Sequence, residues 1–192
     1  MPVIGLVGHT GAGKSTAARW LKVQHHAIVF RHSEFLLAVA AVYGLPVDAL
    51  SLGRIWRGLA SQFGEAVTAE RVCQLIATRE QSSSRLVVID GIRIPAEVER
   101  YRRLPDFVLV KVYADQVMRY ERIRNRRSRP NENEMTWSHF LTIDCSPAHR
   151  YIDVLLDAPG ITLDANGTDE EFSERVEAML QTAQQEVSAR CR

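Results

Sequence analysis

The residues of this sequence best suited to chemistry lie near its N-terminus, where positions 8–15 read G-H-T-G-A-G-K-S. This segment matches the pattern G-x-x-x-x-G-K-[S/T], in which glycines let backbone N–H groups turn inward around a chain of phosphates. A helix that starts at the end of such a loop adds a partial positive charge. The pattern predicts that Lys14 reaches the β- and γ-phosphates of a nucleotide and that the Ser15 hydroxyl binds Mg²⁺.

The nucleotide contacts expected from this loop extend over most of its length. The residues concerned are Gly8, Thr10, Gly11, Ala12, Gly13, Lys14, Ser15 and Thr16, with Thr16 placed at the α-phosphate. A glycine-rich turn that binds nothing is the weaker alternative. The loop alone does not establish catalysis, because GTPases, motor ATPases and kinases all share it.

A second candidate is Asp90, which follows the apolar run 86–89 and precedes Gly91. A carboxylate at the end of a neighbouring strand can hold Mg²⁺, usually through water. An Asp-Gly pair can also simply form a turn, but the phosphate loop needs a metal partner, which favours the metal role. Arg93 follows closely and could reach the phosphate of an acceptor or lie on the surface.

Basic side chains are concentrated in segment 119–129, where Glu121 is the one acidic residue. The arginines are Arg119, Arg122, Arg124, Arg126, Arg127 and Arg129. They could form a solvated helix face or a phosphate-binding clamp, since the planar fork of Arg matches phosphate oxygens, and the phosphate loop favours the clamp. Arg54 and Arg57, one helical turn apart, could likewise face an anionic acceptor or solvent. Glu34 could act as a general base for a hydroxyl acceptor.

Short apolar runs alternate with helical patterns along the chain. Strands are expected at 3–7, 28–30, 86–89, 107–113 and 161–163; helices are expected at 15–22, 33–43, 51–63, 67–80, 97–104, 115–126, 137–144 and after the capping-box pattern T-x-x-E at 168–171. Continuous apolar strands alternating with helices predict an α/β fold with a mostly parallel sheet covered on both faces. Ligands of such sheets bind at the carboxyl ends of the strands, where Gly8, Asp90 and Asp164 are expected.

The composition predicts an ordinary globular chain. It has 192 residues with 24 Lys and Arg against 23 Asp and Glu, a net charge of +1 that calls for neither a nucleic acid nor a membrane as partner. The cysteines, Cys73, Cys145 and Cys191, are odd in number and lack metal-ligand spacing, which favours the cytoplasm over a disulfide-rich setting. We see no signal peptide in residues 1–8, and the longest apolar stretch, 35–45, is too short to span a bilayer.

Several of these motifs resemble those of adenylate kinase and its nucleoside monophosphate kinase relatives. The block Asp90-Gly91-Ile92-Arg93 resembles their D-G-x-x-R element, which implies that Asp90 lies near the metal and Arg93 contacts the acceptor phosphate. Segment 121–126 resembles the R-x-x-x-R start of their lid, which implies that Arg122 packs on the ATP base and Arg126 reaches phosphates. Asn166, before Gly167, resembles the loop that frames adenine in these kinases and in dephospho-CoA kinases.

A closer resemblance is to small archaeal and bacterial proteins described as adenylate kinase-like or dephospho-CoA kinase-like. The shared features are the opening 3–8, the block 88–93, Glu97 and Glu99, and Thr136-Trp137. The chain departs from adenylate kinases in its short lid, which has no cysteine cluster for zinc and no evident second pair of lid arginines. Arg127, Arg129 or Arg150 could replace that pair. Segment 32–34, where the acceptor side begins, fits neither family well.

Together these features predict a single P-loop kinase domain over 1–192, with a three-layer α/β/α fold, a helical acceptor-side cap over 34–80 and a short lid over 124–137. The expected reaction moves the γ-phosphoryl group of Mg²⁺-ATP to a small-molecule acceptor, most simply a nucleoside monophosphate. The expected catalytic residues are Lys14, Asp90, Arg93 and Arg126, and the expected acceptor-binding residues are Glu34, Arg57 and Arg93.

Two alternatives remain open at this point. The first is a dephospho-CoA kinase or another hydroxyl kinase, with Glu34 or Asp90 as general base. The second is a nucleotide-gated binding protein with slow ATPase activity and a protein partner. The choice between ATP and GTP is also open. We expect a monomer or small homo-oligomer.

Overall fold

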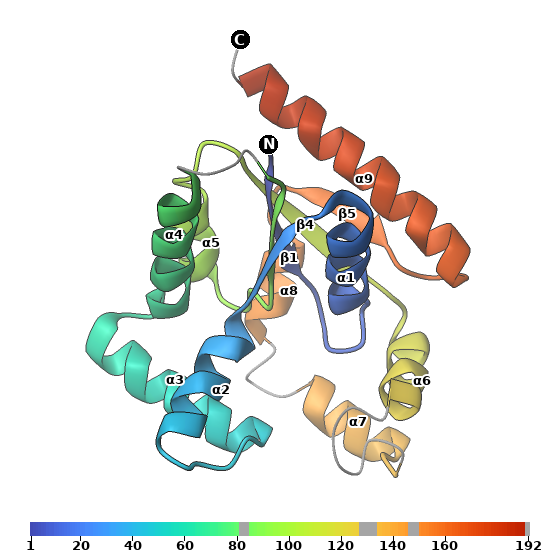
Figure 1. The fold of residues 1–192 in the computed structure, drawn as a ribbon. Coiled ribbons are helices and arrows are strands. Elements are labelled where there is room, and N and C mark those ends of the chain that lie inside the picture. The colour runs from blue at the N-terminus through green and yellow to red at the C-terminus, as the bar shows by residue number, and fades with distance from the viewer. Residues whose placement is uncertain (81–84, 127–133, 146–149, 191–192) are drawn as a thin grey trace.

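The computed structural model describes residues 1–80, 85–126, 134–145 and 150–190. Within them the strands form one five-stranded sheet with the order β2-β3-β1-β4-β5, in which every neighbouring pair is parallel (Figure 1). The strands are β1 (Val3–Val7), β2 (Ile28–Arg31), β3 (Val87–Asp90), β4 (Phe107–Tyr113) and β5 (Ile161–Asp164). The parallel sheet predicted from continuous apolar strands is therefore confirmed.

Helices cover both faces of the sheet because successive strand residues point to opposite faces. Ile4 and Leu6 of β1 pack on one side against α1 (Lys14–His25) and α9 (Asp169–Arg190). Val3 and Val7 face the other side, which is covered by α4 (Val67–Glu80), α5 (Pro95–Tyr101) and α8 (Arg150–Leu156). This arrangement is the expected three-layer α/β/α fold.

The remaining helices lie beyond the carboxyl ends of the strands. Helices α2 (His32–Val42) and α3 (Ala49–Phe63) stand on one side, and α6 (Gln116–Arg126) and α7 (Trp137–Asp144) stand on the other (Figure 1). Parallel sheets bind ligands at this edge. None of the described helices is both long and apolar enough to cross a bilayer.

The predicted cap over 34–80 differs from the structure at its C-terminal third. Ala69, Val72 and Ile76 of α4 are buried in the same core as the strands, so α4 belongs to the layer that covers the sheet. Within 34–80, the helices that project from the sheet edge are α2 and α3 (Figure 1). The middle of the predicted lid, 127–133, lies outside the described residues. Arg127, Arg129 and the side chain of Arg150 lie outside them as well.

Local signals in the sequence agree with the structure at the last helix. The Thr168 N–H donates to Glu171 Oε2 at 3.0 Å, and the Glu171 N–H donates to Thr168 Oγ1 at 3.2 Å, so the capping box at the start of α9 is confirmed. Helix α8 was not expected. The sequence pattern of α8 is weak, because the helix is short and its buried apolar positions are Ile152 and Leu155.

Candidate active site

The phosphate loop connects β1 to α1 and requires glycine where the backbone is crowded. Gly8 has a φ of +154°, and a Cβ at this position would lie 2.3 Å from the backbone oxygen of Val112 in β4. Gly13, which precedes α1, has a φ of +102°, in the left-handed region that favours glycine. The loop therefore passes close to β4 and then turns directly into the first turn of α1.

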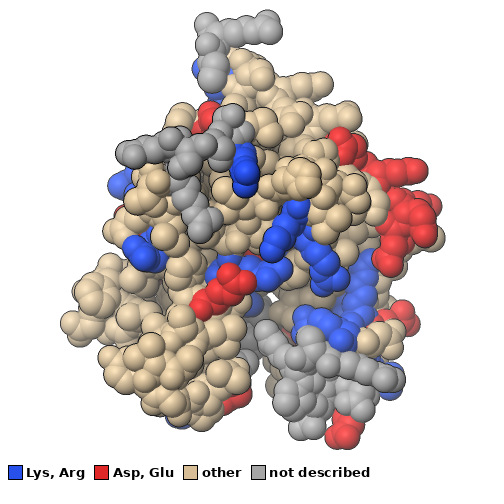
Figure 2. Space-filling view, in the orientation of Figure 1, with Lys and Arg blue, Asp and Glu red and all other residues tan. Residues whose placement is uncertain are grey.

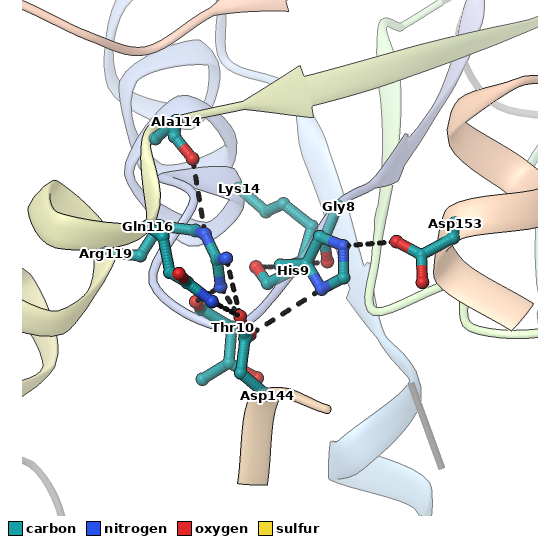
Figure 3. Close-up of polar contacts among 9 residues, drawn as sticks. All are labelled: Gly8, His9, Thr10, Lys14, Ala114, Gln116, Arg119, Asp144 and Asp153. Atoms are coloured by element: carbon teal, nitrogen blue, oxygen red, sulfur yellow. Dashed lines mark hydrogen bonds and ion pairs between the residues drawn. The ribbon is translucent and has the colours of Figure 1, made fainter. Parts of the chain in front are cut away.

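Lys14 is folded back over this loop. Its Nζ donates to the backbone oxygens of Gly8 and His9 at 2.7 and 2.8 Å (Figure 3). The pKa of Lys14 is lowered to about 8, first by burial and then by the positive charges of Arg93, Arg119 and Arg126, while Asp90 opposes them. The structure thus brings Lys14 within electrostatic range of Asp90, Arg93 and Arg126, which are the other three predicted catalytic residues.

Ser15, in the first turn of α1, and Asp90, at the end of β3, lie together at the strand-end edge of the sheet. The Ser15 hydroxyl donates to Asp90 Oδ2 at 2.7 Å, and Asp90 is only 5% exposed. Arg31, at the end of β2, places its Nε 3.7 Å from the same carboxylate oxygen. A hydroxyl and a carboxylate side by side supply the oxygen ligands that Mg²⁺ prefers, so these residues fit the Mg²⁺ that the sequence pattern of the loop predicts.

The predicted acceptor-side residues are only partly assembled. The exposed Arg93 follows Asp90 through the turn at Gly91, and Glu34 is exposed in the first turn of α2. Glu34 accepts from Arg31 Nη1 at 3.1 Å, which joins it to the Asp90 side of the site. Arg57 is exposed on α3, and in the described part of the chain it makes no hydrogen bond or ion pair with another predicted site residue. Sequence reasoning missed Arg31, because nothing in its neighbourhood marks it.

Lys and Arg side chains gather around a hollow that opens beside α2 at the strand-end side of α1 (Figure 2). The positive charges that lower the pKa of Lys14 come from two segments, namely from Arg93 after β3 and from Arg119 and Arg126 in α6. A cationic surface of this kind stabilises a polyanion such as a triphosphate. The overall net charge of +1 conceals this local concentration.

The two residues expected at the nucleotide base lie side by side. Arg122 of α6 donates through Nη2 to the backbone oxygen of Ala165 at 2.7 Å. The next residue, Asn166, accepts from the backbone N–H of Asp115 at 2.9 Å through its side-chain oxygen. The segment after β5 is therefore fastened to the residue that precedes α6 and to the middle of α6.

Arg119 differs from both expectations for the basic segment. It is buried, and its guanidinium binds both carboxylate oxygens of Asp144 in α7 (Figure 3). The same guanidinium donates to the backbone oxygens of Ala114 at 3.2 Å and Thr10 at 3.4 Å. Although burial alone would raise the pKa of Asp144, the hydrogen bonds from Arg119 and Gln116 hold it below its usual range. Arg119 is thus a support of the phosphate loop rather than a solvated or phosphate-facing side chain.

The ring of His9, within the phosphate loop, lies between two carboxylates. Its Nε2 is 2.8 Å from Asp153 Oδ1 in α8, and its Nδ1 is 3.7 Å from Asp144 Oδ1 in α7 (Figure 3). The phosphate loop therefore contacts α6, α7 and α8 through side chains far apart in the sequence.

Similarity to other proteins is clearest for a group named UPF0200. A UPF0200 protein of Hyperthermus butylicus is 33% identical over 141 residues, which cover 72% of this chain and 71% of that protein. A UPF0200/UPF0201 protein of Archaeoglobus fulgidus is 28% identical over 182 residues, and the chain spans only 55% of the length of that relative. The sequence matches no protein-family model.

Solved structures with the same fold carry the names of small-molecule kinases. A shikimate kinase from Bacteroides thetaiotaomicron superposes with a TM-score of 0.58 at 13% identity, covering 95% of this chain and 98% of that one. A gluconokinase from Sinorhizobium meliloti gives 0.54 at 13% identity, covering 96% and 94%. A sugar kinase from Janibacter gives 0.56 at 15% identity, covering 94% and 95%. The predicted P-loop kinase fold is confirmed by these likenesses, which at such identities concern the fold alone.

Proposed function

The chain belongs to the UPF0200 family, and from the geometry of its phosphate loop we propose that it is a P-loop kinase that transfers the γ-phosphoryl group of ATP to a small-molecule acceptor. The observation that carries the proposal is the Ser15–Asp90 hydrogen bond of 2.7 Å beside Lys14. This arrangement joins a metal-binding oxygen pair to a phosphate loop at the edge of a parallel sheet. The kinase names of the proteins with the same fold support it.

The reaction needs little covalent chemistry from the protein. An acceptor oxygen forms a bond to the γ-phosphorus, the bond to the β,γ-bridging oxygen breaks, and ADP leaves with that oxygen. Backbone N–H groups of the phosphate loop and Lys14 hold the phosphates, while Arg93 and Arg126 add positive charge where negative charge develops. When bound, Mg²⁺ would be held by Ser15 and Asp90 and would neutralise phosphate oxygens. Closure of the short lid over 124–137 would exclude water from the transfer.

The acceptor that we favour is a nucleoside monophosphate. The support is Arg93 in its block 90–93, which lies beside Asp90 and within electrostatic range of Lys14. A phosphate acceptor is already ionised at neutral pH and needs no general base, which suits a site where Glu34 is paired with Arg31 at 3.1 Å. Arg57 of α3 would be a second contact for such an acceptor.

A hydroxyl acceptor is the second candidate, because the proteins with the same fold are named for a sugar, gluconate and shikimate. Dephospho-CoA belongs to the same chemical class. Such an acceptor needs a carboxylate base. Asp90, next to the Ser15 hydroxyl, stands nearer to the phosphate loop than the Arg31-paired Glu34 does.

The test measures Mg²⁺-dependent release of ADP from ATP with a panel of acceptors. The panel contains the ribo- and deoxynucleoside monophosphates, dephospho-CoA, gluconate, shikimate and simple sugars. Lys14→Ala is the inactive reference, and Lys22→Ala, an exposed lysine of the same helix, is the matched control. We expect one class of acceptor to stimulate release at least about tenfold in the wild type and the control but not in Lys14→Ala.

Different outcomes separate the candidates. Stimulation by a monophosphate establishes the favoured acceptor, and stimulation by a hydroxyl compound establishes the second candidate. Slow release of ADP that no acceptor changes would overturn the kinase proposal and point to a nucleotide-gated binding protein.

A further inference from the structure

Glu97, in the first turn of α5, is a carboxylate buried beneath the acceptor side of the site. It is 3% exposed. Its Oε2 accepts from the backbone N–H of Arg93 at 2.9 Å and of Ile94 at 3.4 Å. Its Oε1 accepts from the Thr68 hydroxyl of α4 at 2.7 Å and lies 3.1 Å from His32 Nδ1. One carboxylate therefore joins α4, α5, the start of α2 and the loop that carries Arg93.

His32 extends this network. It is the first residue of α2 and is buried, and its Nε2 lies 2.7 Å from the hydroxyl of Tyr101, which is fully buried in α5. Because an ionised carboxylate can only accept hydrogen bonds, Nδ1 is the donor toward Glu97. The ring is thus fixed at both nitrogens, and it ties the end of β2 to α5.

The charge state of Glu97 argues against a packing role alone. Burial by itself would raise the pKa of a carboxyl group, but the neighbouring His32 and the hydrogen bonds from His32, Arg93 and Thr68 hold the pKa of Glu97 below its usual range. A buried charged group with its polar partners stabilises a fold little better than apolar residues of the same volume would. What an apolar residue could not do is bind the two backbone N–H groups of the loop at 93–94.

The network lies directly behind the ends of β2 and β3. Arg31 and Asp90 are neighbours in the register of these strands, and their side chains approach to 3.7 Å. Gly91, with a φ of +99°, passes under His32, so that a Cβ there would lie 3.6 Å from the Cβ of His32. The acceptor side is formed by Arg31 at the end of β2, Glu34 in the first turn of α2 and Arg93 after β3. The same buried carboxylate therefore supports all three residues.

We propose that Glu97 and His32 are positioning residues that hold the Arg93 loop and the start of α2 as one unit, so that both sides of the acceptor site are built together. The proposal rests on the function proposed above for its assignment of the acceptor side. Neither residue touches substrate, because both are buried behind the strand ends. They act through the backbone of Arg93 and through the first turn of α2.

The first test compares Glu97→Gln with Glu99→Gln. Glu99 is the exposed glutamate of the same helix and serves as the matched control. We expect Glu97→Gln to raise the KM for the acceptor at least about tenfold while the Kd for ATP stays within about twofold, and Glu99→Gln to change neither. A merely structural role would weaken ATP binding and acceptor binding together. An unchanged acceptor KM, or a parallel loss of both, would overturn the proposal.

A second measurement does not depend on knowing the acceptor. In Glu97→Gln, amide hydrogen exchange should become at least about tenfold faster both at 93–94 and at the hydrogen-bonded amides of α2 that follow its first turn, while the phosphate loop at 8–15 keeps its wild-type rates. Faster exchange at 93–94 alone would overturn the coupling between the two segments. If no acceptor stimulates the wild type, the kinase proposal fails and this exchange pattern still decides the positioning role.

A second variant covers the case in which Glu97→Gln does not fold. His32→Gln leaves the two backbone hydrogen bonds to Glu97 Oε2 in place and removes the ring that links α2 to α5. We expect faster exchange at the hydrogen-bonded amides of α2 and a higher acceptor KM, again with unchanged ATP affinity. Wild-type values for both quantities would overturn the proposal.

Discussion

Two buried carboxylates, Asp144 and Glu97, support the nucleotide side and the acceptor side of the site, and they bind different groups. Asp144 binds the guanidinium of Arg119, which in turn reaches the backbone oxygens of Thr10 and Ala114. Glu97 binds His32 and takes the backbone N–H groups of the loop at 93–94. Asp144 therefore orients a cation toward the backbone oxygens of Thr10 and Ala114. Glu97, in contrast, itself binds backbone N–H groups, those of the loop at 93–94.

The surroundings of the two carboxylates differ as well. Glu97 lies in the helical layer that packs on the sheet, next to the core residues Val98 and Tyr101. Asp144 ends α7, which stands beyond the sheet edge and packs on α6 through Tyr120, Trp137 and Phe140 (Figure 1). On the nucleotide side, the helices that stand beyond the sheet edge are therefore fastened to the phosphate loop through the ion pair of Asp144 with Arg119. On the acceptor side, Glu97 is part of a layer that is continuous with the core. The two carboxylates should consequently respond differently to mutation.

The largest expected effect is that of Asp144→Ala. Removing the carboxylate leaves the buried Arg119 without its ion-pair partner, which should lower the free energy of unfolding by about 3 kcal/mol or more. Urea unfolding followed by circular dichroism measures this change. Asp153→Ala is the control, because Asp153 also contacts His9 but its side chain is 69% exposed. Equal losses in the two variants would contradict the importance assigned to the ion pair.

The intermediate effect concerns Glu97 and acid. Because the folded protein holds the pKa of Glu97 below its usual value near 4.5, its ionisation stabilises the fold at neutral pH, and this stabilisation is lost as the pH falls through the lowered value. Glu97→Gln should therefore be less stable than wild type by about 1–3 kcal/mol at pH 7. The difference should shrink in unfolding curves recorded below about pH 4.

The contribution of Asp144 has the same sign, but it is present in both proteins and cancels in this comparison. A stability difference that stays constant from pH 7 to pH 3 would contradict an ionised Glu97. Such a constant difference would be explained by a change in packing alone.

The comparison also separates what the sequence predicts from what it does not. The phosphate loop and β4 follow from local patterns, and so does the capping box at Thr168, because each depends on residues close together in the chain. The meeting of Ser15 with Asp90 follows from the rule that parallel strands end at one edge.

The supports of the site depend on distant pairs that no local pattern marks. Arg119 resembles its exposed neighbours in a basic segment, and only its contact with Asp144 of another helix distinguishes it. His9 pairs with a residue of α8, a helix whose two buried positions give almost no periodic signal. Glu97 is part of the sequence pattern that carries the family resemblance, but its partners His32 and Thr68 belong to other helices.

The smallest expected effect sharpens the comparison at the loop itself. Lys14 binds the backbone oxygen of His9 rather than its side chain, so His9→Asn should leave the lysine in place. The contact of His9 with the exposed Asp153 resembles a surface ion pair, and a double-mutant cycle with Asp153→Asn should give a coupling energy of about 0.5 kcal/mol. ATP affinity in His9→Asn should then stay within about threefold of wild type, as calorimetry can measure. A coupling energy above about 1.5 kcal/mol would mean that α8, rather than the Arg119–Asp144 pair, holds the phosphate loop.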